Sequence, residues 1–194
     1  MRRPAALLTA LLAAAALTSC AAEDEGGAGS APPDSTTAMD VEEGARLEFR
    51  LVESAEGAED TEGCLAKHPE TGGTAPASDA GPDEPVTACA NFDGVLYEAT
   101  FAPAFVTGDQ VSYVDFDYGT AGIPTVYVVF EDEGVDAWKA ATADGFGTVA
   151  IMVGGALYRT TGVQLSPNDI HQIEGIGTIE EAEAIATALA TGEP

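Results

Sequence analysis

The spacing of hydrophobic residues constrains the fold of this chain more than any other feature of its sequence. Segments with the β-branched, aromatic or alternating residues typical of strands are 96–101, 111–119, 125–130, 148–153, 156–161 and 169–176. After the third of them the period changes, and Val135, Trp138 and Ala141 recur every three residues, as on one face of a helix. The sequence therefore predicts strands interrupted by a helix, with Trp138 in the core.

The last twenty residues predict a second helix. Thr178 and Glu181 have the spacing of a capping box, which satisfies free N–H groups at a helix start. A single apolar stripe follows and consists of Ile179, Ala182, Ile185, Ala186 and Leu189. Gly154-Gly155 predicts a tight hairpin turn between two of the strands. From residue 125 the order is then β-α-β-β-β-α, which predicts an α+β fold with a mostly antiparallel sheet and two helices packed on one face.

The first half of the chain contains one clear strand pattern and two segments of low complexity. In LEFRLVES, residues 47–54, Leu47, Phe49 and Leu51 alternate with Glu48, Arg50 and Val52, which predicts a strand with one face in water. Residues 20–45 are polar, acidic and rich in Gly and Pro, as a flexible linker is. Residues from about 55 to 92 have a similar composition and predict a long disordered loop. We expect the folded domain to span 46–194.

The N-terminus has the features of a bacterial lipoprotein signal. Two arginines precede a short apolar run, and Leu-Thr-Ser stands directly before Cys20. This resembles the signal in which the cysteine is diacylated and becomes the new N-terminus, so 1–19 is predicted to be removed. An ordinary signal peptide that happens to carry a cysteine is the alternative. We expect a protein anchored by lipid alone on the extracytoplasmic face of the cell membrane.

The mature chain is strongly acidic. Loss of Arg2 and Arg3 with the signal leaves five basic residues against 33 acidic ones, a formal charge of −28. Such a surface repels nucleic acid and anionic headgroups, so neither is an expected partner. Solubility outside the cell is the simplest reason for the charge, although a cationic partner is also compatible with it.

Two cysteines remain in the mature chain besides the lipidated one. Cys64 and Cys89 predict a disulfide at the base of the acidic loop, because an even pair in an oxidising compartment is usually bridged. A metal site with Cys64 and His68 is the alternative, but it lacks the paired spacing of zinc ligands. Calcium binding by Asp79, Asp83 and Glu84 is a further alternative, although they lack the spacing of a calcium loop.

No motif in the sequence predicts an enzymatic reaction or a bound cofactor. Gly175-Ile176-Gly177 begins like a dinucleotide fingerprint, but Glu180 occupies the position of the third glycine. His171 stands alone in a predicted strand, where a structural role is more common than a catalytic one. We therefore expect no catalytic, cofactor-binding or metal-binding residues.

Four segments in order resemble one family, the first large extracytoplasmic domain of SecD and SecDF, which assist protein export. The first is Phe49-Arg50-Leu51-Val52, followed by a low-similarity insertion, and the second is a strand ending at Phe130 with Glu133-Gly134 and a helix. The third is the hairpin at 150–155. The fourth combines Ile173, Gly175, Thr178, Glu180-Glu181-Ala182 and Gly192-Glu193-Pro194.

The resemblance covers about 47–194 and implies a SecD-like head domain. The chain departs from the family at Thr160-Thr161-Gly162, where the family usually has Ser-Ala-Pro, and it lacks the family's membrane helices. The resemblance thus implies a module that binds exported polypeptides or the export channel and has no motor activity. A small-ligand-binding or envelope-structural lipoprotein with the same fold is the alternative.

Overall fold

The computed structural model describes residues 37–58, 62, 64, 78–92, 95–119, 121–145, 147–165 and 169–194. Its strands are β1 (Met39–Asp40), β2 (Leu47–Gly57), β3 (Val86–Phe92), β4 (Val95–Phe101), β5 (Val106–Thr107), β6 (Val111–Tyr118), β7 (Pro124–Phe130), β8 (Thr148–Val153), β9 (Ala156–Gly162) and β10 (Ile170–Ile173). Its helices are η2 (Gly108–Gln110), α2 (Asp132–Ala141) and α3 (Ile179–Thr191). The predicted signal, residues 1–19, and the predicted lipidation site Cys20 lie outside the described residues.

The described strands form two sheets. The four-stranded sheet has the order β1-β6-β7-β10, and the six-stranded sheet has the order β3-β4-β2-β8-β9 with β5 beside β2. All the strand pairings are antiparallel. The α+β class and the predominance of antiparallel strands are therefore confirmed, and so is the β-α-β-β-β-α order from β7 to α3.

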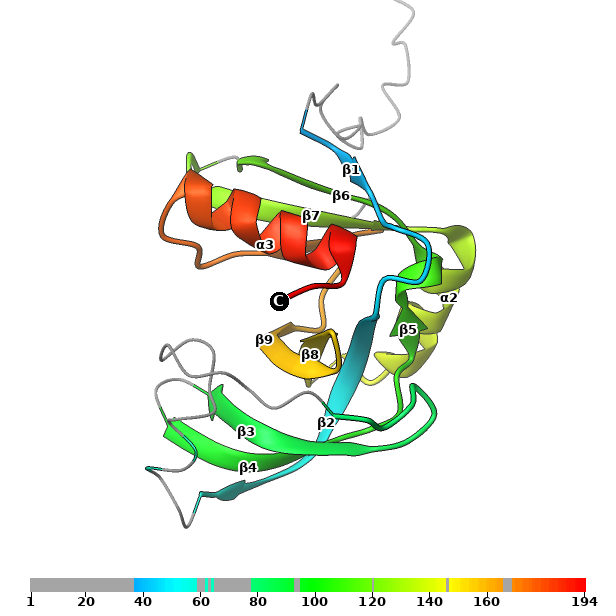
Figure 1. The fold of residues 1–194 in the computed structure, drawn as a ribbon, viewed down its shortest axis with the longest axis vertical. Coiled ribbons are helices and arrows are strands. Elements are labelled where there is room, and N and C mark those ends of the chain that lie inside the picture. The colour runs from blue at the N-terminus through cyan, green and yellow to red at the C-terminus, as the bar shows by residue number, and fades with distance from the viewer. Residues whose placement is uncertain are drawn as a thin grey trace, which may run out of the picture.

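Helix α3 lies between the two sheets (Figure 1). Its predicted stripe packs into one core with β6 and β7 above it and β8 below it. Two further alanines outside the stripe, Ala188 and Ala190, are also buried. The small stripe residues Ala182 and Ala186 allow strands of both sheets to pack close to the helix.

Helix α2 closes one end of this core. Trp138 is 1% exposed, and its indole N–H donates to the Val163 carbonyl at 2.7 Å. Its ring lies edge-on to Phe49 at 5.6 Å and tilted against Phe130 at 5.2 Å. The prediction that Trp138 is a core residue is confirmed.

The predicted turn and helix cap are confirmed in detail. Gly154 and Gly155 have φ of 59° and 81°, the left-handed conformation that a two-residue hairpin turn requires. The Thr178 hydroxyl accepts from the Glu181 N–H at 3.1 Å. The Glu181 carboxylate in turn accepts from the N–H of Gly177, one residue earlier than in the usual box.

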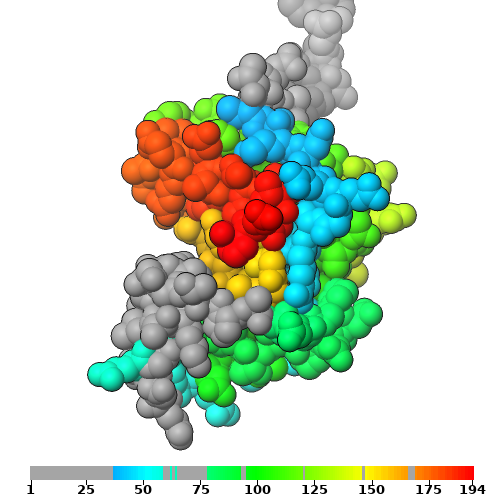
Figure 2. All heavy atoms as spheres, viewed as in Figure 1, coloured from blue at the N-terminus to red at the C-terminus, as the bar shows by residue number. Residues whose placement is uncertain are grey.

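The domain begins earlier than the predicted residue 46. Met39 in β1 pairs with Val114 of β6, and the Glu42 N–H donates to the Ala190 carbonyl of α3 at 2.8 Å. Figure 2 shows these N-terminal residues lying against the C-terminal ones. The last residues of the predicted linker, 20–45, are therefore part of the fold, because they pair with the four-stranded sheet and cover the end of α3.

The predicted loop at 55–92 is also too long. Strand β2 continues to Gly57, and β3 pairs with β4 from Val86 onward. The alternation of Val86, Ala88, Ala90 and Phe92 was the signal that could have revealed β3. These strands enclose a second apolar cluster inside the curved six-stranded sheet, made of Val86, Ala90, Ala99, Phe101, Ala150, Met152 and Leu157.

Candidate functional site

The second face of β2, predicted to lie in water, is buried. Glu48 is 4% exposed and Arg50 is 0% exposed. The two side chains form an ion pair at 2.7 Å. The prediction of a solvated face was wrong because the six-stranded sheet curves around this face of β2 and residues 78–85 cover it.

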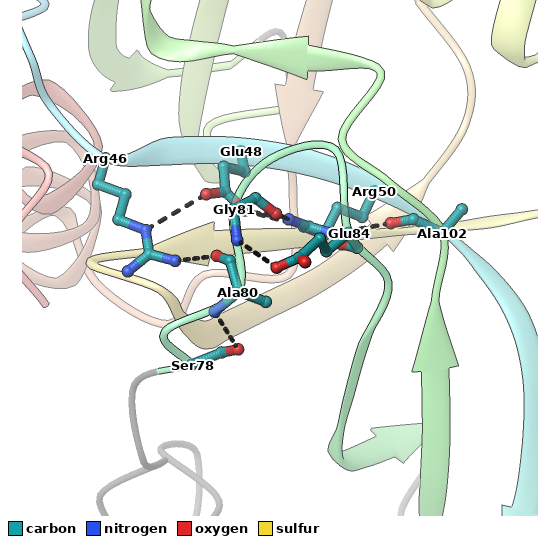
Figure 3. Close-up of polar contacts among 8 residues, drawn as sticks. All are labelled: Arg46, Glu48, Arg50, Ser78, Ala80, Gly81, Glu84 and Ala102. Atoms are coloured by element: carbon teal, nitrogen blue, oxygen red, sulfur yellow. Dashed lines mark hydrogen bonds and ion pairs between the residues drawn. The ribbon is translucent and has the colours of Figure 1, made fainter.

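We call residues 78–85 the strap. It is held by Arg50 of β2 and by Arg46, which directly precedes β2 (Figure 3). The Arg50 guanidinium donates to the carbonyls of Gly81 at 2.9 Å and Glu84 within the strap. Arg46 donates to the carbonyl of Ala80 and pairs with Glu48 at 3.3 Å. The strap is therefore attached through its main chain.

Further main-chain contacts fix the start and the middle of the strap. The Ser78 N–H donates to the Gly155 carbonyl at 2.7 Å, and the Ala104 N–H donates to the Pro82 carbonyl at 2.7 Å. Arg50 also donates to the Ala102 carbonyl at 3.0 Å. A buried guanidinium is tolerated only where its charge and its N–H groups are satisfied, as they are here. We interpret this cluster as structural, because it holds the strap against β2.

The two cysteines predicted to pair are joined. Cys64 and Cys89 form a disulfide with their Cα atoms 5.4 Å apart, and Cys89 lies in β3. Within the described part of the chain, no group of three or more His, Cys, Asp or Glu side chains could hold a metal ion. His68 of the alternative metal site lies outside that part. The Glu84 carboxylate accepts from the Gly81 N–H at 3.2 Å, so it helps to shape the strap.

An open cleft of about 500 Å³ lies between β9 and β10, and we call it the β9–β10 cleft. Strand β9 is an edge strand of the six-stranded sheet, and β10 is an edge strand of the four-stranded sheet. The cleft is lined by Thr160, Thr161, Gly162, Gln164, Leu165, His171, Gln172 and Glu174. Its walls are thus mostly polar and uncharged, with one carboxylate.

His171 is the buried polar residue of this cleft. It is 1% exposed, and its ring stacks on Trp138 with centroids 4.6 Å apart. Its Nδ1 lies 3.3 Å from the Gln164 carbonyl, which can only accept, so Nδ1 carries the proton. Burial lowers the pKa of His171 to about 4, against the opposing hydrogen bond to Gln164. The ring is therefore neutral at neutral pH, and its Nε2 is a buried acceptor without a partner among the described residues.

The cleft was not predicted from the sequence. Its two walls lie in β9 and β10, and its residues are of kinds that are common on any surface. His171 was correctly assigned to a strand and interpreted as structural. Only the pairing of strands shows that it borders a cleft between two sheets.

Among the described residues, no helix is long and apolar enough to cross a membrane. The predicted lipidation site, Cys20, lies outside the described residues.

No protein-family model matches the chain, and no curated protein matches it. Similar solved structures are of SecDF. A structure of SecDF in super-membrane-facing form is 23% identical over 77% of this chain, with a TM-score of 0.47, and the match covers 19% of that chain. A structure of a membrane component SecDF that enhances protein export is 22% identical over 77% of this chain, with a TM-score of 0.46 and 64% of that chain covered.

A third structure, SecDF from Thermus thermophilus, described as a translocon-associated membrane protein, is 14% identical with a TM-score of 0.42. It is matched over 79% of this chain and 30% of its own. The chain thus spans less than two thirds of each of these structures. They belong to the family that the sequence motifs resemble, but at these TM-scores they carry no argument about function.

Proposed function

We propose that the protein is a lipoprotein anchored to the extracytoplasmic face of the cell membrane, with a SecD-like domain that binds extended polypeptide segments. The segments would come from exported polypeptides or from the protein-export channel. The module has no motor or enzymatic activity in this proposal. Support for the anchor comes from the signal residues before Cys20, and support for the export link comes from the SecD-like motifs.

The observation that carries the binding role is the β9–β10 cleft. An edge strand has main-chain N–H and C=O groups on its outer side, where no neighbouring strand pairs with it. An extended polypeptide can use such groups whatever its side chains are, which suits a binder of many sequences. The cleft lies between two such strands, of which β10 is bridged at His171 by Leu165, and its Thr and Gln side chains add hydrogen-bonding groups.

A small-ligand-binding role would be supported by a closed apolar pocket. The cleft is instead bordered by the exposed residues Gly162, Gln164, Gln172 and Glu174. An open polar cleft surrounds a small molecule less completely than a typical ligand pocket does. The geometry of the described residues therefore favours the polypeptide.

Site-specific photocrosslinking in native membranes tests the proposal. A photoreactive residue at Gln172, inside the cleft, should capture secreted polypeptides or an export-channel component. The same residue at Glu133, exposed on α2 and away from the cleft, is the matched control. Identical adducts from both positions, or none from Gln172, would contradict the assignment of the cleft.

A further inference from the structure

The described basic side chains are all used within the protein itself. Arg46 and Arg50 both pair with Glu48, Lys139 pairs with Asp169 at 2.8 Å, and Arg159 lies 4.0 Å from Glu181. Carboxylates are far more numerous than these four cations, so the surface carries an uncompensated negative charge. Its field favours the approach of cationic ligands.

Arg159, the cation beside the β9–β10 cleft, does not reverse this charge. Its guanidinium donates to the Glu174 carbonyl at 3.2 Å and lies 3.4 Å from the Gly175 carbonyl. Its charge is also partly balanced by Glu181. The Glu174 carboxylate is exposed, and it is the one charged side chain in the lining of the cleft.

The acceptors of the cleft are available to a donor. The Glu174 carboxylate is exposed and only accepts hydrogen bonds. The hydroxyls of Thr160 and Thr161 can orient themselves to accept as well. Ammonium and guanidinium groups only donate, so they complement this lining in hydrogen bonding as well as in charge.

We propose that the β9–β10 cleft receives a lysine or arginine side chain of a bound extended polypeptide, with the Glu174 carboxylate as its counter-charge. The inference rests on the proposed function, because it names the class of segment that the same cleft selects. Main-chain contacts provide general affinity, and the basic side chain provides the preference.

Fluorescence anisotropy with the full chain, purified in detergent, tests this preference. The probes are labelled unstructured peptides of Ser, Thr and Ala with one central residue, either lysine or its uncharged isostere norleucine. A second pair compares arginine with citrulline. We expect the charged peptide of each pair to bind about fivefold more tightly at low salt, the upper range for a solvent-exposed ion pair. The difference should shrink at about 0.5 M salt because screening weakens exposed pairs.

Two variants assign the preference to the cleft. Glu174→Gln should reduce the lysine-to-norleucine ratio to nearly one, whereas Glu133→Gln on α2 should leave it unchanged. Since Glu174 is exposed, its variant should stay folded.

The outcomes separate this inference from the function on which it rests. Equal binding of lysine and norleucine peptides would overturn the inference and leave polypeptide binding intact. A preference that survives Glu174→Gln would also overturn it, since the charge would then act elsewhere. Failure of every peptide to bind would overturn the proposed function and this inference with it.

Discussion

Removing the guanidinium of Arg50 should destabilise the domain more than loss of any exposed ion pair. In Arg50→Met the side chain keeps an apolar stem but leaves Glu48, which is 4% exposed, with only its longer contact to Arg46 at 3.3 Å. The carbonyls of Gly81, Glu84 and Ala102 lose the guanidinium as donor, although Gly81 still accepts from the Glu84 N–H. Breaking a buried pair by removing one partner costs about 3–5 kcal/mol of unfolding free energy.

The expected change in melting temperature follows from the size of the domain. At about 2–4 °C per kcal/mol for a chain of this length, the loss corresponds to a decrease of roughly 6–20 °C. Circular dichroism during heating measures it. Release of the strap should also expose residues 78–85 to proteases in the native state, which limited proteolysis can detect.

Lys139→Met is the matched control. It also removes one cation from an ion pair, but the side chains of Lys139 and Asp169 are 55% and 44% exposed. An exposed pair contributes about 0–1 kcal/mol, so the melting temperature should change by only a few degrees. Similar decreases in melting temperature for Arg50→Met and Lys139→Met would refute the conclusion that the Arg50 cluster stabilises the domain.

Three further predictions concern the cysteines and His171. Replacing both Cys64 and Cys89 with Ser should lower the melting temperature by several degrees, because the bridge closes a loop of 25 residues and such a loop contributes about 3.5 kcal/mol on the chain-entropy model. Two free thiols in protein from the native envelope would contradict the bridge. Cys20→Ala should give unlipidated protein with little membrane retention, and firm retention in the membrane fraction would overturn the anchor. Burial lowers the pKa of His171 from 6.5 to about 4. Between these two pH values His171 is protonated in the unfolded chain but neutral in the folded domain. Stability should therefore decrease from pH 6.5 towards 4, by at most about 1.4 kcal/mol per pH unit from this residue, and unfolding measured against pH should show a smaller decrease for His171→Phe.

Local patterns predicted the parts of the fold that depend on local chemistry. The Gly154-Gly155 turn, the Thr178 cap and the position of Trp138 follow from residues within one turn or one helix face. The burial of Glu48 and Arg50 could not be predicted in this way. Both are charged residues at alternating positions of a strand, the pattern of a solvated face, and they are buried because of residues about thirty positions later.

The strap restricts where a ligand can bind. The hollow of the six-stranded sheet would otherwise present Glu48 and Arg50 to a polypeptide, but the strap already occupies their hydrogen-bonding groups through its carbonyls. A ligand at this position would first have to displace the strap. The Arg50 guanidinium would then lack its hydrogen-bond partners until the ligand had replaced each of them. The β9–β10 cleft requires no such displacement among the described residues, since Gln172 and Glu174 in its lining are exposed. The arginine of the SecD-like Phe49-Arg50 motif therefore stabilises the domain in our interpretation, and our proposal places polypeptide binding at the β9 edge of the same sheet.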